Sequence, residues 1–286
     1  MSEETRHSSE TDLLSALLDR GPLNAGVFFA GSVCRHTDFP ADDNKGHMHL
    51  VHRGPVTLVT EGKDPVEIIQ PSLVMLAEPI PHRILCSEGV GAELVCARLS
   101  FDAMVAHPRL LGLPDELILP FADVPGLDAA AKSLFDEAFS ERFGRMTVLN
   151  SLVELLLLYL LRYCVASNRT DRGLLAGLAD PKLARALVAL HEDPAADWCI
   201  ENLADAAGMS RANFAAAFKM RIGVSPGNYL TSVRLTLAKQ KLRAGERLKA
   251  VAPQVGYKST TALSRVFERH FGTAPRDWLH QESASM

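Results

Sequence analysis

The amino-acid sequence predicts an α+β protein of two domains, with a β-rich N-terminal part and an all-helical C-terminal part. Three observations lead to this prediction. The chain has 286 residues, which is enough for two domains. Short apolar runs separated by glycine, proline and aspartate fill residues 23–100, a texture typical of a β-sandwich or barrel. From about residue 128 onward, the apolar residues recur at helical spacing instead.

Strands come first in the expected order, and helices follow them. The clearest strands are residues 26–31, 56–60, 66–69, 73–77 and 93–97. One helix is predicted around Leu134 and Phe139, and a longer one over residues 148–165. The long helix has more leucine than one buried face requires, so it either completes a domain core or forms the interface of a homodimer. The polar residues 168–173 are predicted to link the two domains.

The two parts differ in charge. Residues 181–286 carry 15 basic and 9 acidic side chains, a net charge of +6, whereas the first 180 residues carry 15 and 25, a net of −10. Only the C-terminal part is therefore suited to a polyanionic partner. The longest apolar run, residues 155–161, is far shorter than the about 20 residues that a membrane span needs. Because no signal-peptide pattern precedes it, we expect a soluble, cytoplasmic protein without a membrane partner.

Residues 200–219 have the pattern of a helix, a tight turn and a second helix. Ala204 and Ala207 lie on the predicted buried face of the first helix, and the small Ala204 side chain lets two helices cross closely. Gly208 supplies the permissive backbone of the turn. Ser210 is a suitable N-cap for the next helix. The sequence therefore predicts a helix-turn-helix unit here.

The same pattern recurs over residues 248–267, with Gly256 at the turn and Ser259 at the cap. The second turn is one residue longer than the first. One helix, which begins at Pro226, joins the two units. Pro253 departs from the pattern because it removes a backbone donor inside a helix, so we expect a kink there.

These motifs make residues 181–280 similar to the DNA-binding domain of the AraC/XylS family of transcription regulators. The matching positions are Pro226, Tyr229, Leu230, Arg234, Leu235, Ala238, Val255, Gly256, Tyr257, Phe267, Phe271, Gly272, Pro275 and Trp278. The resemblance implies that two recognition helices enter successive major grooves on one face of double-stranded promoter DNA. It implies a transcription factor and not an enzyme.

The resemblance also indicates which residues contact DNA. The matching positions are Arg211, Asn213, Lys219, Thr260, Thr261, Ser264 and Arg265. Arg265 suits bidentate pairing with a guanine edge, and Lys219 is expected to meet phosphate. In the first recognition helix, Ala212, Ala215 and Ala216 can touch only thymine methyl groups, so base reading there would rest on Arg211 and Asn213.

Residues 11–125 resemble the cupin-like sensory domain of one branch of the same family. The resemblance rests on residues 46–54, 71–77 and 79–82. It implies an N-terminal cupin-like β-barrel, followed by a helical dimerisation or linker region over residues 126–172. The full prediction is therefore a cupin-like barrel plus helices, joined to an all-α domain with a tandem helix-turn-helix.

Three histidines are candidate ligands of a divalent metal such as zinc. His47 and His49 alternate on one predicted strand, so both imidazoles project from the same face, and His82 can join them across the barrel. Metal-binding cupins add an acidic ligand soon after the histidine pair, and we cannot place one in this sequence. The alternative is that the histidines line a pocket for a small effector.

The five cysteines suggest a second kind of sensor. In a cytosolic protein they argue against a structural disulfide framework. Cys34 and Cys96 match the cysteines implicated in a branch of the family that senses reactive chlorine species. Arg35 and His36 can stabilise a thiolate at Cys34, whereas Cys96 lies in an apolar run and is expected to be buried. The effector is thus an oxidant or a small ligand.

A cupin-type enzyme fused to a DNA-binding tail is the competing interpretation. Catalysis would require a complete set of histidine and acidic ligands, and the acid is missing. The sequence also lacks a P-loop, a nucleophile elbow and a Cys-x-x-Cys motif. We therefore predict a regulator whose acidic N-terminal domain controls a basic DNA-binding domain.

Overall fold

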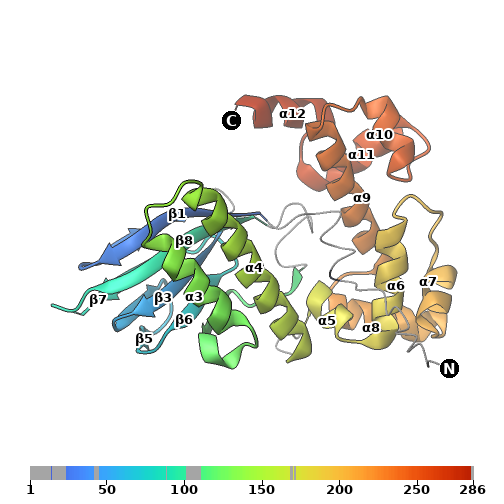
Figure 1. Cartoon of the computed structure of the whole chain (residues 1–286). Coiled ribbons are helices and arrows are strands. Elements are labelled where there is room, and N and C mark those ends of the chain that lie inside the picture. Colours follow the sequence, from blue (N-terminus) through green and yellow to red (C-terminus); the bar gives the residue numbers. More distant parts are fainter. Residues whose placement is uncertain are drawn as a thin grey trace, which may run out of the picture. The chain divides into compact units, whose positions relative to one another are not determined.

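The computed structural model describes Leu14, Thr170 and residues 24–41, 45–87, 89–100, 111–167 and 172–284 (Figure 1). The described residues from 24 to 175 form one unit, and those from 176 onward form the other. The predicted linker region over residues 126–172 is mostly helical, and its helices belong to the N-terminal unit.

The N-terminal unit contains two antiparallel sheets. The first has the strand order β1 (Asn24–Val33), β8 (Ala92–Ser100), β3 (Gly46–Arg53), β6 (Ser72–Leu76) and β9 (Glu116–Pro120). The second has the order β2 (Thr37–Phe39), β7 (His82–Cys86), β4 (Val56–Thr60) and β5 (Val66–Ile68). The described strands thus form two separately hydrogen-bonded sheets and not the closed barrel that the resemblance implies. Each sheet keeps its own two edge strands.

The core of this unit lies between the two sheets. On β4, Val56, Leu58 and Thr60 are buried while the residues between them are half-buried, as expected for a strand with one face turned to a core. Val56 and Leu58 pack in one cluster with Val74 of β6 and Ile84 of β7. All five residues of β6 are buried, because helices cover the other face of its sheet.

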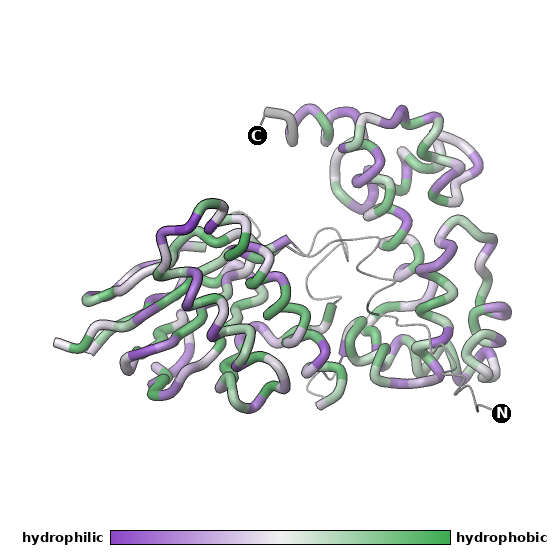
Figure 2. The backbone as a smooth tube through the Cα atoms, in the orientation of Figure 1, coloured by the Kyte–Doolittle hydropathy of each residue, from purple (hydrophilic) through white to green (hydrophobic). Residues whose placement is uncertain are grey.

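Two helices, α3 (Leu127–Ala138) and α4 (Arg145–Ala166), lie across the first sheet (Figure 1). A short 3-10 helix, η1 (Phe121–Asp123), leads into them. α4 is hydrophobic along most of its length (Figure 2), and its length and composition would also suit a membrane span. In the structure it packs as a core helix: seven of its side chains are buried, and Asn150 Oδ1 accepts a hydrogen bond from the Val27 N–H of β1 at 2.9 Å.

The C-terminal unit is helical. Its helices are α5 (Leu174–Leu178), where the chain passes from one unit to the other, α6 (Pro181–Glu192), α7 (Ile200–Ala207), α8 (Arg211–Ile222), α9 (Pro226–Arg243), α10 (Leu248–Gln254), α11 (Thr260–Phe271) and α12 (Pro275–Ala284). The proline expected to disturb a helix, Pro253, lies inside α10, which ends one residue later. The lost backbone donor therefore falls in the last turn of a seven-residue helix.

Candidate DNA-binding surface and cupin pocket

Helices α7 and α8 form the first helix-turn-helix unit. α7 ends at Gly208, whose φ of 63° is left-handed and suits glycine. The Met209 N–H then donates to the Ala204 carbonyl oxygen at 2.9 Å, a bond typical of a Schellman ending. Ser210 begins α8, because its side-chain oxygen accepts a hydrogen bond from the Asn213 N–H at 3.4 Å. The predicted turn and cap are both confirmed.

Helices α10 and α11 repeat this arrangement. Gly256 has a φ of 80°, and the following Tyr257 N–H donates to the Ala252 carbonyl oxygen at 2.9 Å. The Ser259 hydroxyl accepts from the Ala262 N–H at 3.1 Å and caps α11. Between the turn glycine and the serine cap, the second turn is one residue longer than the first, as predicted. Both units therefore use the same hydrogen bond and the same kind of cap.

The predicted DNA-contacting residues of the second unit share one face of α11. Thr261 and Arg265 are exposed and lie one helical turn apart, while Thr260 and Ser264 beside them are half-buried. The opposite face of α11 packs into the core of the unit. α11 thus presents hydroxyl groups and the guanidinium groups of Arg265 and, one turn later, Arg269 to solvent.

The predicted residues of the first unit are also exposed, but one of them has a partner. Arg211, Asn213 and Lys219 all lie on the surface of α8. Arg211 Nη1 lies 2.7 Å from Glu201 Oε1 of α7 and holds the pKa of that carboxyl below its usual range. This ion pair holds the Arg211 guanidinium of α8 against α7. The sequence pattern did not indicate this contact.

Arg234 of α9 connects the two helix-turn-helix units. Its Nε and Nη2 donate to the carbonyl oxygens of Pro194 and Ala196, each at 2.7 Å, in the segment that precedes α7. Its guanidinium carbon also lies 5.8 Å from the ring centre of Tyr257, in the second turn. The sequence marks Arg234 only as a position that matches the family, and these contacts give the physical reason for an arginine there.

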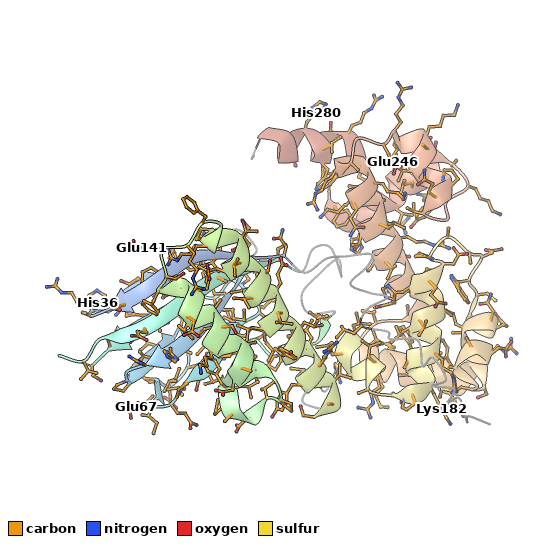
Figure 3. All side chains as sticks on the ribbon, in the orientation of Figure 1. His36, Glu67, Glu141, Lys182, Glu246 and His280 are labelled. Atoms are coloured by element: carbon orange, nitrogen blue, oxygen red, sulfur yellow. The ribbon has the colours of Figure 1, made fainter. Side chains whose placement is uncertain are left out.

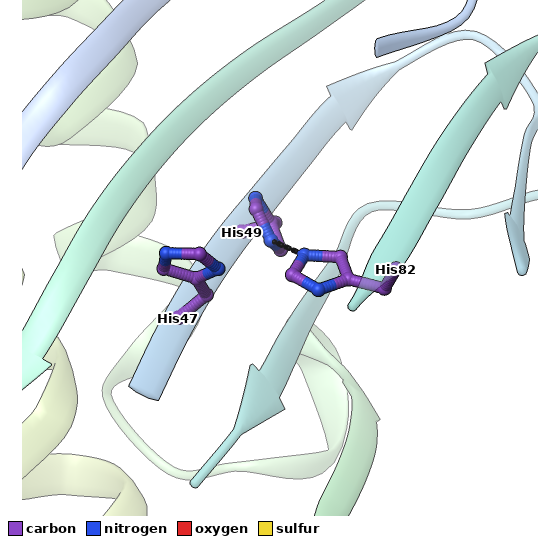
Figure 4. A group of neighbouring side chains, drawn as sticks. All are labelled: His47, His49 and His82. Atoms are coloured by element: carbon purple, nitrogen blue, oxygen red, sulfur yellow. Dashed lines mark hydrogen bonds between the residues drawn. The ribbon is translucent and has the colours of Figure 1, made fainter. Parts of the chain in front are cut away.

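The three candidate metal ligands meet inside the N-terminal unit (Figure 4). His47 and His49 project from the same face of β3, and His82 approaches from β7 of the other sheet. All three side chains are buried, and one nitrogen from each lies within 4.8 Å of the others. His49 Nε2 and His82 Nε2 are 2.7 Å apart. His82 Nδ1–H donates to the Ile80 carbonyl oxygen at 2.8 Å, which leaves Nε2 as the lone-pair nitrogen.

The environment favours the neutral form of the His49 and His82 imidazoles, which is the form that binds metal. Burial lowers the pKa of His49 well below its usual value, and the neighbouring His82 and His47 lower it further. Burial also lowers the pKa of His82, although the Ile80 carbonyl and the Glu116 carboxylate oppose this effect. The buried Nδ1 of His49 has no hydrogen-bond partner among the described residues.

Glu116 of β9 is the nearby carboxylate that sequence reasoning missed. Its Oε2 accepts a hydrogen bond from the Thr60 hydroxyl at 2.8 Å and lies 3.4 Å from Lys63 Nζ. These contacts hold it outside the group of three histidine nitrogens. Glu116 follows the cupin-like segments by more than thirty residues, so no short motif marks it. Burial lowers the pKa of the neighbouring His82, and the negative charge of Glu116 opposes this effect.

A pocket of about 260 Å³ opens beside His47. Phe28, Phe29, Phe39 and Arg98 contribute most of its wall. β1 has a bulge at Phe28, because Val27 pairs with Ala97 whereas Phe29 pairs with the next residue of β8, Cys96. The bulge places Phe28 between the His47 ring, 5.7 Å away between ring centres, and the Arg98 guanidinium, 4.5 Å from its ring centre. The pocket combines aromatic side chains with the guanidinium of Arg98, the carboxylate of Asp38 and the imidazole of His47.

The structure does not bring the two predicted sensor cysteines together. Cys96 is fully buried in β8 opposite Phe29, and burial raises the pKa of its thiol strongly. Cys34 is exposed and lies one residue beyond the end of β1. The His36 side chain, two residues further on, projects away from the sheets (Figure 3).

Cys34 instead lies close to Cys86. A Cβ atom added to Gly91 would lie 3.4 Å from the Cys34 sulfur. Cys86, at the end of β7, hydrogen-bonds with the backbone of Ala92. Burial raises the pKa of the Cys86 thiol, and the neighbouring Cys34 thiol raises it further. Both cysteines therefore contact the same two-residue segment from different sheets.

Comparisons with known proteins agree with both halves of this description. Residues 12–166 match the Cupin family model, and residues 203–281 match that of a helix-turn-helix domain. An uncharacterized HTH-type transcriptional regulator of Haemophilus influenzae is 35% identical over 91% of this chain and 94% of its own length. A putative AraC-like transcription regulator of Streptomyces lividans is 30% identical over 93% and 96% of the two chains.

The RCS-specific HTH-type transcriptional activator RclR of Escherichia coli is more distant, at 27% identity over 72% of this chain and 74% of its own. The cupin model covers more than half of the chain, and the first two relatives align over almost their whole length. The chain therefore belongs to the AraC family of DNA-binding transcriptional regulators and carries an N-terminal cupin domain.

Proposed function

We propose that this regulator binds promoter DNA in the cytoplasm through α8 and α11, and that its cupin domain controls the binding. The repeated turn and serine cap ahead of two exposed recognition helices carry the proposal. The net charge of +6 over residues 181–286 supplies attraction to phosphate. The second helix of such a unit enters a major groove, so two units suit two grooves one helical turn apart.

The residues have different tasks in this proposal. Arg265 pairs with a guanine, and Thr261 contacts the neighbouring base edge. Asn213 suits an adenine, and Lys219 neutralises a phosphate without reading sequence. The remaining predicted contacts flank these positions and are Arg211, Thr260 and Ser264.

The experiment compares the intact protein on the DNA upstream of its own gene and on random DNA, by fluorescence anisotropy at moderate salt. Binding to the upstream DNA should be at least about a thousandfold tighter. Arg265→Ala should weaken binding to the upstream DNA about tenfold to a hundredfold. Lys219→Ala should weaken binding to both DNAs by the same factor and should reduce the salt dependence of binding. Equal affinity for the two DNAs would contradict the proposal.

We also propose that His47, His49 and His82 hold a divalent metal such as zinc, and that the effector enters the pocket beside His47. Three buried imidazoles from two sheets suit zinc, which accepts histidine nitrogen and leaves a fourth position open. The hydrogen bond that His82 Nδ1–H donates to the Ile80 carbonyl oxygen is also typical of a metal-bound histidine. A bound metal would supply a Lewis-acidic contact for an effector, and Arg98 and Phe28 would bind the rest of it.

Isothermal titration with zinc tests the metal site. The wild-type protein should bind one equivalent, and His49→Ala should lose more than about a hundredfold in affinity, since removing a group that only hydrogen-bonds to a metal ligand already costs about 10–100-fold. His52→Ala is the matched control, because His52 lies on the same strand but stacks on Phe135 and not in the cluster. Equal loss in both variants would assign the binding to non-specific histidine contacts.

A second candidate function is oxidant sensing, which the proximity of Cys34 and Cys86 favours. In this reaction hypochlorous acid would convert the Cys34 thiol to a sulfenyl chloride and water, and the Cys86 thiol would displace chloride to form a disulfide. Two thiols and one hypochlorous acid thus yield one disulfide, one water, one chloride and one proton. The exposed Cys34 reacts first, and the less accessible Cys86 resolves it.

Stoichiometric hypochlorite followed by peptide mass spectrometry tests this candidate. A peptide pair joined through Cys34 and Cys86 should form, together with a change in promoter affinity. Cys34→Ser and Cys86→Ser should both abolish the change, whereas Cys96→Ser, at the buried position, should not. A response that needs Cys96 but not Cys86 would rule out this pairing and restore the pair expected from the family.

We propose, finally, that a second copy of the chain binds to α4. Besides its buried face, α4 exposes Met146, Val148 and Leu155, and the exposed Phe139 and Phe143 adjoin them. Exposed apolar side chains gathered in one region are typical of an interface. A homodimer would place two DNA-binding domains on repeated sites.

A further inference from the structure

The two recognition helices present different chemistry to solvent. On α8, Ala212, Ala216 and Met220 are all exposed and follow one another at a spacing of four residues. Residues four apart lie on the same side of a helix, so these three form a single apolar stripe. The Met220 side chain is 64% exposed and extends the stripe with a large apolar group.

The polar groups at the start of α8 already have partners within the protein. Arg211 Nη1 lies 2.7 Å from Glu201 Oε1. The Ser210 hydroxyl accepts the hydrogen bond from the Asn213 N–H that caps the helix. The first turn of α8 therefore offers methyl groups, with Asn213 as its remaining polar side chain.

α11 instead exposes polar and charged side chains. Thr261, Arg265 and Glu268 are exposed on it, and no large apolar side chain among the described residues of α11 is exposed. Arg265 has five N–H donors in a planar fork, which matches the two acceptors of guanine in the major groove. The two helices therefore cannot read the same base pattern.

In the major groove the thymine methyl is the one apolar group on a base edge, whereas guanine, cytosine and adenine present only polar groups there. An alanine set against those polar edges would leave them without water or a hydrogen-bond partner, which is unfavourable. Against a thymine methyl the same alanine buries apolar surface, which is favourable.

Accepting that α8 and α11 bind DNA as proposed above, we infer that α8 reads thymine methyl groups through Ala212 and Ala216. The operator is then asymmetric: the half-site under α8 has thymines at fixed positions, and the half-site under α11 has a guanine. Met220 continues the apolar stripe toward the end of α8.

The test begins with selection of binding sites from random DNA by the full-length protein. The half-site whose guanine preference disappears in Arg265→Ala lies under α11, which assigns the other to α8. Each thymine of the α8 half-site is then replaced by deoxyuridine, which removes the methyl group and keeps the base pair. Affinity should fall about fourfold for each contacted methyl removed, and the same replacement outside the two half-sites should change nothing.

A protein variant completes the test. Ala216→Asn should abolish the sensitivity to deoxyuridine at one position, whereas Ala250→Asn, at an exposed alanine of α10, should leave it intact. The inference is overturned if the selected α8 half-site lacks thymine, or if deoxyuridine has no effect there. Failure of the selection to yield any preferred sequence would instead overturn the proposed function itself, and this inference with it.

Discussion

Arg234 shows how one side chain can join distant parts of the DNA-binding domain. It is separated by about forty residues from the carbonyl groups that it binds, and it also contacts the second turn through Tyr257. Both acceptors are backbone oxygens near the start of α7. Loss of the guanidinium would leave them without this partner and loosen the position of the first unit relative to α9.

We expect Arg234→Ala to lower the free energy of unfolding of the C-terminal unit by about 2 kcal/mol, since hydrogen bonds from charged donors are worth about 1.5–3 kcal/mol. Urea denaturation followed by tryptophan fluorescence measures this, because both tryptophans, Trp198 and Trp278, lie in that unit. Arg234→Lys should not restore stability, since lysine lacks the planar fork. Lys249→Ala, at an exposed position of α10, should be neutral; an equal loss there would contradict this reasoning.

The histidine cluster likewise depends on the placement of a few single residues. His47 and His49 share a face because strand side chains alternate, and this much follows from their spacing. The approach of His82 to 2.7 Å depends on how the second sheet packs against the first. Glu116 lies near the cluster on a third strand, β9, where its contacts with Thr60 and Lys63 fix the position of its carboxylate.

At the scale of the elements, the two turns differ in how tightly they are surrounded. Gly208 and Gly256 are both left-handed, but a Cβ atom on Gly256 would lie 2.7 Å from the Arg234 guanidinium, closer than any contact at Gly208. The second turn therefore needs glycine for space as well as for backbone conformation. The hydrogen bonds of Arg234 to the Pro194 and Ala196 carbonyl oxygens hold its guanidinium in this position.

Gly256→Ala should destabilise the C-terminal unit by more than the about 1–2 kcal/mol that a left-handed alanine costs by itself. Gly245→Ala is the matched control, because Gly245 has a similar φ of 84° and no atom within 4 Å of an added Cβ. Urea unfolding of the two variants isolates the effect of the contact. Identical losses would show that the Arg234 side chain simply moves aside.

At the scale of the whole molecule, the exposed face of α4 is the interface of the proposed homodimer. The buried face of this helix completes the N-terminal core, while the exposed Val148 and Leu155 lie seven residues apart on the same side. A homodimer formed there would bury these side chains and join two regulators into one DNA-binding particle.

Leu155→Glu should therefore convert the dimer to a monomer in analytical ultracentrifugation, because a buried, unpaired carboxylate at the interface is strongly unfavourable. Affinity for a repeated operator should fall with it, while affinity for a single site should not. Ser133→Glu, on the exposed surface of α3, is the control and should leave the dimer intact. A wild-type protein that sediments as a monomer at micromolar concentration would contradict the proposed interface.

The sequence by itself determined the features that depend on near neighbours. Gly208 with Ser210, and Gly256 with Ser259, mark both turns and both caps, since a left-handed turn and an N-cap are set within four residues. The β-rich and helical parts were equally predictable, because strand and helix impose different periods on the apolar residues.

The tertiary structure alone decided which distant residues meet. It places Cys34 near Cys86 and away from the buried Cys96, joins Arg211 to Glu201, and arranges the strands as two sheets. Strand order and sheet packing bring together residues tens of positions apart, and no local pattern encodes those distances. Contacts within a turn can be read from spacing, whereas contacts between sheets or helices depend on how the whole core packs.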